Sequence, residues 1–261
     1  MGLFDKKFCD ICGGKIGLLG NRKLEDGNLC KDCAAKLSPW FSERRHSTVE
    51  EIKDQLKYRE ENRAAAAAFR VTRSFGRNVK LLLDEDARKF TVTAASDLAE
   101  ANPDILDYSQ ITGCETDVEE RKNELKRKDA EGRLVSYDPP RYEYAYDFYV
   151  TVYVNSPYFD DMRFKLNASP VETGEHAMGG SVIVKPGMGA VPGAGDYNEN
   201  VKLGGEIKRA LDDLRQGVRD EAAQAAAPKQ KVVCPLCGAL TLPDDAGCCE
   251  YCGGPVGTDA G

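Results

Sequence analysis

The central part of the chain alternates hydrophobic and polar residues with a period of two, which is typical of β-strands that bury one face. The clearest stretch is 142–154, where aromatic and β-branched residues occupy every second position. Residues 79–83 and 89–93 flank a polar turn and are predicted to form a hairpin. Further strands are expected at residues 105–111, after Gly113 and at 162–166. The pattern therefore predicts an antiparallel β domain.

One central stretch breaks this alternation. Residues 119–131 consist mostly of Lys, Arg, Glu and Asp, without an apolar residue at every second position. We expect this stretch to interrupt the sheet as a loop or a short helix.

Two other segments have the period of helices. Thr48-Val-Glu-Glu51 fits a capping box, and we interpret the helix that follows, as far as the alanine run at 64–68, as a solvated connection. Residues 201–218 carry one apolar stripe, which we expect to pack on the β domain because it would otherwise face water. The stripe consists of Leu203, Ile207, Leu211, Leu214 and Val218.

A glycine-rich segment and a linker complete the central part. Residues 185–195 contain many glycines but lack the Gly-Lys-Ser/Thr end of a phosphate-binding loop, and two prolines remove backbone amides. We therefore interpret them as a flexible surface loop. Residues 222–230 are interpreted as a linker.

Eight of the ten cysteines form four Cys-x-x-Cys pairs, in two groups. Cys9–Cys12 and Cys30–Cys33 are separated by 17 residues, and Cys234–Cys237 and Cys249–Cys252 by 11. A two-residue spacing lets one tight turn present both sulfurs to a tetrahedral ion. The sequence therefore predicts two structural zinc sites, with Cys9, Cys12, Cys30 and Cys33 as one ligand set and Cys234, Cys237, Cys249 and Cys252 as the other.

The local patterns around the two groups differ. A hairpin with its turn at Asp26-Gly27 follows the first pair, and the second pair begins a helix that ends before Ser38-Pro39. This order resembles a treble-clef zinc finger. The last two pairs are joined by a short segment without room for a helix, which resembles a zinc ribbon.

Other roles for these cysteines fit less well. A thioredoxin-like redox pair needs one Cys-x-x-Cys in a βαβ pattern, and a catalytic zinc keeps a position open for water. Four thiolates close each site, and the chain has only two histidines, His46 and His176. Iron or an iron–sulfur cluster shares the ligand type and remains the alternative occupant.

Two cysteines remain outside the pairs. Cys248 has the wrong spacing to Cys252 for a two-residue turn, and we interpret it as a bystander near the metal rather than a reactive thiol. Cys114 lies in a strand-like stretch without a nearby histidine, so we expect a small buried hydrophobic side chain.

These patterns together predict an α+β chain of five parts. Antiparallel strands followed by one amphipathic helix resemble the pleckstrin-homology-like architecture, a bent sheet closed at one end by its last helix. The predicted parts are a treble-clef-like zinc finger at 1–47, a linker helix at 48–70, an antiparallel β domain with its C-terminal helix at 71–221, a linker at 222–231 and a zinc ribbon at 232–257.

Composition and charge narrow the functional classes. The 261 residues hold 41% hydrophobic and 30% charged residues, which is ordinary for a globular protein. No apolar run approaches the ~20 residues that span a bilayer, and the first cysteine pair comes too early for a signal peptide. Because ten reduced cysteines suit a reducing compartment, we expect a cytoplasmic protein.

The beginning of the chain resembles a bacterial family of uncharacterised proteins. The resemblance rests on Phe8-Cys-Asp-Ile-Cys-Gly-Gly-Lys-Ile-Gly-Leu-Leu-Gly and on Leu29-Cys-Lys-Asp-Cys-Ala-Ala-Lys-Leu, together with Ser38-Pro-Trp-Phe and Ser47-Thr-Val-Glu-Glu-Ile. The family is identified by an N-terminal four-cysteine zinc-binding domain of unknown function and a C-terminal zinc ribbon. It implies zinc at the first four cysteines and no known reaction.

Three functional classes follow. The first is a non-enzymatic protein with two zinc ions per chain that binds an unidentified protein partner, through exposed sheet edges or the 142–154 hairpin. The alternative is a nucleic-acid-binding zinc-finger protein. The net charge disfavours this alternative, because residues 1–47 carry +3, residues 48–228 carry −8 and residues 229–261 carry −2. An enzyme is not expected, since no nucleophile, acid–base pair or cofactor loop is recognisable, and the sequence does not indicate an oligomeric state.

Overall fold

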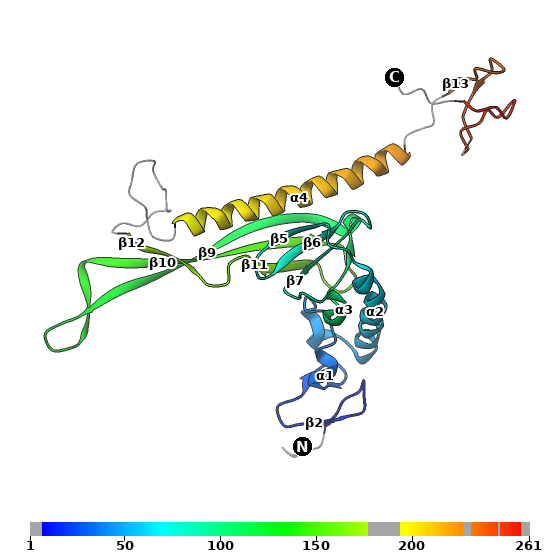
Figure 1. Ribbon diagram of the computed structural model, residues 1–261. Helices are drawn as coiled ribbons and strands as arrows, with labels where there is room; N and C mark the ends of the chain where they lie inside the picture. Colours follow the sequence, from blue (N-terminus) through cyan, green and yellow to red (C-terminus); the bar gives the residue numbers. More distant parts are fainter. Residues whose placement is uncertain (1–6, 177–193, 227–230, 245, 257–261) are drawn as a thin grey trace. The chain divides into compact units, whose positions relative to one another are not determined.

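The structure, a computed structural model, describes residues 7–176, 194–226, 231–244 and 246–256 (Figure 1). The chain divides into two compact units, with the boundary after Arg215. Helices and antiparallel strands both occur, as the sequence predicts. In the described ranges, none of the helices combines the length and apolar character that crossing a bilayer requires.

The first unit begins with a small domain that we call the first cysteine module, residues 7–47. Two antiparallel strand pairs, β1 with β2 and β3 with β4, are followed by the short helix α1. The second pair forms the hairpin expected around Asp26-Gly27. The element bounds are β1 Lys7–Phe8, β2 Lys15–Ile16, β3 Arg22–Lys23, β4 Asn28–Leu29, α1 Lys31–Ala34 and the 3-10 helix η1 Glu43–His46.

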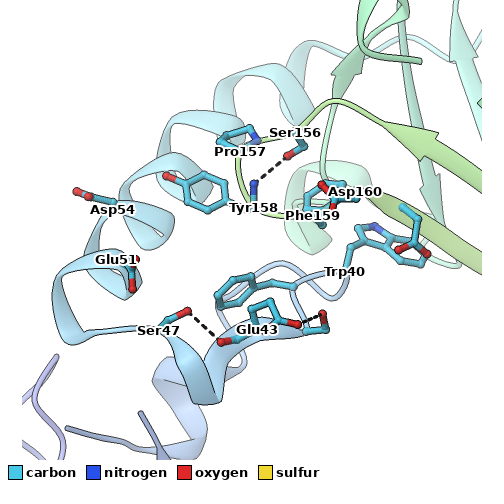
Figure 2. Close-up of a pocket in the computed structure, with 13 residues that line it drawn as sticks. Trp40, Glu43, Ser47, Glu51, Asp54, Ser156, Pro157, Tyr158, Phe159 and Asp160 are labelled. Carbon is cyan, nitrogen blue, oxygen red and sulfur yellow. Dashed lines mark hydrogen bonds between the residues drawn. The ribbon is translucent and has the colours of Figure 1, made fainter. Parts of the chain in front are cut away.

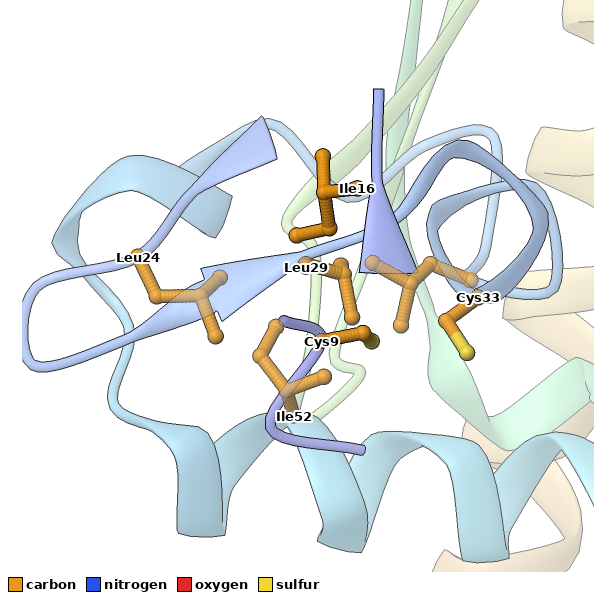
Figure 3. Close-up of a cluster of buried hydrophobic side chains, with 7 residues drawn as sticks. Cys9, Ile16, Leu24, Leu29, Cys33 and Ile52 are labelled. Atoms are coloured by element: carbon orange, nitrogen blue, oxygen red, sulfur yellow. The ribbon is translucent and has the colours of Figure 1, made fainter. Parts of the chain in front are cut away.

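Helix α2, Val49–Ala68, is buried along one face, first in the core of the first cysteine module and then against polar groups of the β domain. It begins at the predicted capping box, where the Thr48 side chain accepts the Glu51 amide at 3.3 Å and Glu51 accepts the Thr48 amide at 2.7 Å. The interpretation of this helix as a solvated connection is wrong. Ile52 is fully buried in the core of the first cysteine module (Figure 3). The later turns bury Gln55, Arg59, Asn62 and Ala66.

A buried ion pair fastens the first cysteine module and α2 to the β domain. The Arg59 guanidinium donates to Asp104 at 2.8 Å, to the Lys36 carbonyl at 3.3 Å and to the Asn102 carbonyl. Ser38 donates to the other oxygen of Asp104 at 2.9 Å. Both charged side chains are buried, so each depends on the other for its compensation.

The β domain contains two four-stranded antiparallel sheets. In the first, the strands follow chain order, β5 to β8, and the predicted hairpin at 79–83 and 89–93 is confirmed as β6 and β7. Their bounds are β5 Arg73–Gly76, β6 Lys80–Asp84, β7 Lys89–Thr93 and β8 Leu106–Asp107, with the short helix α3 Leu98–Ala101 between β7 and β8.

The second sheet is organised around β10, Leu134–Val154, which contains the predicted 142–154 strand. On one side β10 pairs with β9, Ile111–Lys128, along nearly its whole length. On its other side it pairs with β11, Asp161–Lys165, and with β12, Val171–His176. The side chains at alternate positions from Tyr144 to Val154 are buried, as the period-two pattern requires. The 3-10 helix η2, Tyr108–Gln110, precedes β9.

The expectation of a loop or short helix at 119–131 is wrong for residues 119–128, which form the outer half of β9. Opposite charges and aromatic rings stabilise this half across the strands. Arg121 donates to Asp147 at 2.6 Å, and the Lys122 ammonium lies 3.9 Å from the centre of the Tyr142 ring. We call residues 119–142, the outer half of the β9–β10 hairpin, the ribbon. None of these residues is buried, so the ribbon has no apolar face, and a prediction based on hydrophobic alternation misses it.

Helix α4 spans Ala194–Ala226, and its part in the first unit, up to Arg215, lies along the second sheet (Figure 1). The prediction that residues 201–218 pack on the β domain is confirmed at Ile207 and Leu211, which are fully buried. Lys208 donates to the Cys114 carbonyl in β9 at 2.7 Å. The helix begins earlier and ends later than predicted, so residues 222–226 are helical and not a linker. The glycine-rich segment up to residue 193 and the linker residues 227–230 lie outside the described residues.

The second unit contains what we call the second cysteine module, residues 231–256. Its only paired strands within the described residues are β13, Val232–Val233, and β14, Leu240–Thr241. The buried hydrophobic cluster contains Cys234, Cys249 and Val256, with Val232 packed against it. A cluster of this size is too small to hold the module together without further cross-links.

The buried ion pair gives the first prediction. We expect Arg59→Met to lower the free energy of unfolding of the first unit by about 3–5 kcal/mol, because Asp104 would stay buried without its countercharge. The double variant Arg59→Met/Asp104→Leu should recover part of that loss, since both charges are then gone. Urea unfolding followed by circular dichroism measures both values. If Arg59→Met changed the free energy of unfolding by less than about 1 kcal/mol, the ion pair would not be a major contribution to the stability of the first unit.

Candidate metal centres

The first pair of cysteines lies in a tight backbone turn. The Cys9 amide donates to the Gly14 carbonyl at 2.8 Å, and the Gly13 amide donates back to the Cys9 carbonyl at 2.8 Å. Gly13 has a φ of +70°, a conformation that glycine adopts without strain. This turn brings the sulfurs of Cys9 and Cys12 to the same side of the backbone.

The second pair uses a helix start instead of a turn. Cys30 is the N-cap of α1, and its sulfur accepts the Cys33 amide at 3.4 Å. The Cys30 amide in turn donates to the Cys9 sulfur at 3.3 Å. Backbone N–H groups therefore point at the sulfurs, which stabilises negative charge there.

The four sulfurs of the first module fit a tetrahedral metal ion. All four lie within 4.8 Å of one another, and Cys12 and Cys30 have their sulfurs 3.8 Å apart. Zinc–sulfur bonds of about 2.3 Å in a tetrahedron place sulfurs roughly 3.8 Å apart, whereas a disulfide would need about 2.05 Å. The geometry matches a four-thiolate metal site and not a pair of disulfides.

The protonation of these thiols also suits metal binding. Burial raises the pKa of Cys9, but backbone N–H groups of Cys12, Cys30 and Ile11 outweigh it and lower that pKa to about 6. Burial and the neighbouring sulfurs raise the pKa of Cys33. A metal ion that binds the thiolates displaces the protons that Cys33 would otherwise retain.

The site is part of the core of its module (Figure 3). Cys9 and Cys33 are buried together with Ile16, Leu24, Leu29, Leu37 and Ile52. Cys12 is exposed and Cys30 is half-buried, so one side of the sulfur cluster faces solvent. A metal ion bound here would therefore hold cysteines that belong to the same core as Ile52 of α2.

The second module presents its cysteines in two copies of the same turn. The Cys234 amide donates to Ala239 at 2.9 Å, and the Cys249 amide donates to Gly254 at 2.8 Å. Each turn closes through a glycine amide that donates back to the first cysteine, Gly238 to Cys234 and Gly253 to Cys249, and both glycines have positive φ. These are the same contacts as in the Cys9 turn, so three of the four pairs share one local structure.

The four sulfurs of the second module also lie within 4.8 Å of one another. Cys234 and Cys252 have their sulfurs 3.6 Å apart, and Cys237 and Cys249 have theirs 3.7 Å apart. Burial raises the pKa of Cys249, but the Cys252 and Tyr251 amides lower it to about 6. The structure thus brings together all eight predicted ligands, in the two predicted groups, and each group can hold one ion.

The two remaining cysteines lie where the sequence places them. Cys248 is half-buried and outside the sulfur cluster; its amide donates to Asp244 at 2.8 Å. Cys114 is buried in β9, and this burial raises its thiol pKa to about 11. That value leaves Cys114 protonated at neutral pH, as expected of a small core side chain.

A cavity that sequence reasoning missed lies where the end of the first cysteine module and the start of α2 meet the β domain (Figure 2). It encloses about 440 Å³ between residues 40–54 and the 156–161 turn. Five carboxylates line it, and among its described lining residues there is no Lys, Arg or His. Its aromatic wall includes Trp40, the only tryptophan of the chain, and Tyr158. Such a lining repels phosphate groups and suits a cationic or apolar one.

The geometry predicts two zinc ions per chain, one in each cysteine module. We expect elemental analysis of protein from zinc-supplemented medium to give a ratio near two. Cys249→Ser should lower the ratio to about one, because three sulfurs bind far more weakly than four. Cys248→Ser is the matched control and should keep two ions. Zinc loss in the Cys248 variant but not in the Cys249 variant would contradict the ligand assignment.

Because α2 joins the first cysteine module to the β domain, loss of the first metal should weaken both. In Cys30→Ser, Ser38 and the Lys36 carbonyl lose their fixed positions, and each buried partner left unpaired costs about 1–3 kcal/mol. We therefore expect a lower melting temperature for the β domain. Cys237→Ser is the control: it removes the second metal and should leave this melting temperature unchanged, since Cys237 belongs to the other unit. Equal melting curves for both variants would contradict the coupling.

Comparisons with known proteins agree with this description at one end of the chain. Residues 7–55 are similar to a family described as a domain of unknown function (DUF4428). The matched segment contains the first cysteine module and the start of α2, including Ile52, and so corresponds closely to the packed core of Figure 3. No curated protein and no solved structure matches the chain. The chain therefore begins with a four-cysteine domain similar to DUF4428, whose function is not known.

Proposed function

We propose that this chain is a non-enzymatic, cytoplasmic zinc protein that binds a protein partner, with its two zinc ions in structural roles. In this proposal the first cysteine module is a treble-clef-like finger, the second is a zinc ribbon, and the central domain is related to the pleckstrin-homology-like architecture. The order of turn, hairpin and helix supports the first assignment, and the paired turns support the second.

The structural role of zinc follows from the donor sets. Four thiolates complete the coordination of a tetrahedral zinc ion, whereas catalytic zinc keeps a position for water or substrate. Each cysteine module also has only a small core of its own, so the ion supplies cross-links that the packing lacks. Metal binding therefore contributes to folding in this proposal rather than to chemistry.

The observation that carries the partner-binding role is the outer half of the β9–β10 hairpin. Its two strands stay paired from Asn123–Glu143 to Lys128–Leu134, yet no residue from 119 to 142 is buried. A ribbon of this length gains little stability by itself in water. It keeps backbone and side chains of both strands accessible, which suits a partner that adds to the sheet edge or covers one face.

The charges of the ribbon favour a protein partner over nucleic acid. Residues 119–142 hold seven Lys or Arg and six Asp or Glu, so the ribbon carries almost no net charge. Several of these charges are already used, since Arg133 pairs with Asp129 at 3.0 Å and Arg121 with Asp147. A nucleic-acid interface needs a continuous basic surface. Bound zinc would also remove two charges from the +3 of residues 1–47, leaving about +1.

Shortening the ribbon tests this proposal. Asn123 and Glu143 lie opposite each other, so replacing residues 124–142 by Asn-Gly joins the strands through a two-residue hairpin turn. We expect the shortened protein to keep two zinc ions and its melting temperature. We expect it to lose at least tenfold in the yield of whichever protein the full chain captures from its native lysate.

The control for this experiment substitutes exposed charges elsewhere, at Glu60 and Arg63 on α2, which pair with each other. This Glu60→Gln/Arg63→Gln variant should capture the partner as the full chain does. Capture that is unchanged by the shortening would refute the ribbon as the binding element. Capture of nucleic acid in place of protein, lost on raising the salt concentration, would favour the alternative function.

A further inference from the structure

The turn between β2 and β3 exposes two adjacent leucines. Leu18 is 87% exposed and Leu19 is 84% exposed, the highest values among the large hydrophobic side chains of the described residues. A single exposed leucine is ordinary on a protein surface, but two neighbouring ones at a tip form a patch that invites an apolar partner.

The local backbone holds these leucines outward. The Gly20 amide donates to the Gly17 carbonyl at 3.0 Å, so Leu18 and Leu19 occupy the two central positions of a tight turn. Ile16, immediately before the turn, is buried in the module's core and anchors it (Figure 3). Water-facing turns favour Gly, Asn, Asp or Ser at their central positions. Two leucines there oppose the local preference and point to a function.

The cations around this turn are not neutralised by ion pairs within the described part of the chain, although Arg44 of the same module donates to the Lys23 carbonyl at 2.6 Å. Residues 7–47 contain eight Lys and Arg side chains, and none forms an ion pair with a carboxylate of the described residues, whereas Arg121, Arg133 and Arg163 in the β domain all do. Lys15 and Lys31 line the same shallow recess as the two leucines, with Asp32 as the one carboxylate among its described lining residues. Arg22 and Lys23 begin the strand that follows the turn.

Two of the five acidic residues of the module are held by backbone amides, whereas Asp32 lines the recess beside Lys15 and Lys31. Asp10 accepts the Asn28 amide at 2.6 Å, and Asp26 accepts the Val49 amide at 2.8 Å, so both carboxylates are engaged by backbone. A four-thiolate zinc ion would lower the module's total charge by two. The leucines would therefore make the apolar contacts with a partner surface, and the cations would favour a surface of negative charge.

We propose that the first cysteine module docks on an anionic phospholipid surface, with Leu18 and Leu19 inserted at the level of the headgroups and Lys15, Lys31 and Arg22 against the lipid phosphates. Apolar side chains at a tip, surrounded by Lys and Arg, are the combination that binds the surface of an anionic bilayer without spanning it. A bilayer is fluid and needs no shape complementarity, which suits two leucines exposed at a turn. This inference is independent of the partner-binding role of the hairpin.

Vesicle flotation with the zinc-loaded full chain tests the inference. One set of vesicles is pure phosphatidylcholine, and the other contains phosphatidylcholine and phosphatidylglycerol at about three to one. We expect binding to the anionic vesicles and at least tenfold less to the neutral ones. Raising the salt concentration should weaken binding, because it screens the contacts of the cations.

Two variants distinguish the contribution of Leu18 and Leu19 from non-specific hydrophobic adhesion to vesicles. Leu18→Ser/Leu19→Ser should lower vesicle binding at least tenfold, because serine suits the turn but not the bilayer. The matched control Leu134→Ser/Leu240→Ser removes two exposed leucines elsewhere and should bind as the original protein does. Zinc content and melting temperature should be the same in all three proteins, which shows that folding is intact.

Several results would overturn the inference. They are absence of binding to anionic vesicles, equal binding to neutral ones, and undiminished binding by Leu18→Ser/Leu19→Ser. Without lipid binding, a protein with an apolar pocket becomes the occupant to test for this turn.

Discussion

The buried contact between Arg59 and Asp104 determines how the first unit is organised. An arginine and an aspartate placed out of water need each other and need further hydrogen bonds, or their burial is too costly. Burial alone raises the pKa of Asp104, and the neighbouring Arg59 and the Ser38 hydroxyl act in the opposite direction. Since Ser38 belongs to the first cysteine module and Asp104 to the β domain, satisfying this one pair requires both to be in place.

Both cysteine modules bring four sulfurs together, but the hydrophobic clusters that surround the sulfurs differ in size. In the first, Cys9 and Cys33 are buried beside leucines and isoleucines, and α2 completes the core. In the second, Cys234 and Cys249 share their cluster with Val256 and the partly buried Val232. The second module would therefore depend more strongly on a bound metal ion, whereas the first is also held by its contacts with the β domain.

The sequence predicts what depends on short-range rules. The Cys-x-x-Cys-Gly turns, the capping box at Thr48 and the β6–β7 hairpin each follow from residues close together in the chain, and the structure contains all of them. Hydrophobic patterns in the sequence do not reveal the features that depend on buried polar side chains. Gln55, Arg59 and Asn62 give α2 a buried face without an apolar stripe, so hydrophobic periodicity indicates a solvated helix. The outer half of β9 is the reverse case, a strand held by pairing without any buried face.

The position of Trp40 has a consequence for spectroscopy. It is the only tryptophan in the chain and lies in the acidic, aromatic cavity between the first cysteine module and the β domain (Figure 2). Its indole nitrogen is buried without a hydrogen-bond partner in the described structure. Water that enters when the two parts separate would hydrate the indole and shift its emission to longer wavelength. The tryptophan emission wavelength therefore reports whether the first cysteine module and the β domain are in contact, even while strands elsewhere remain folded.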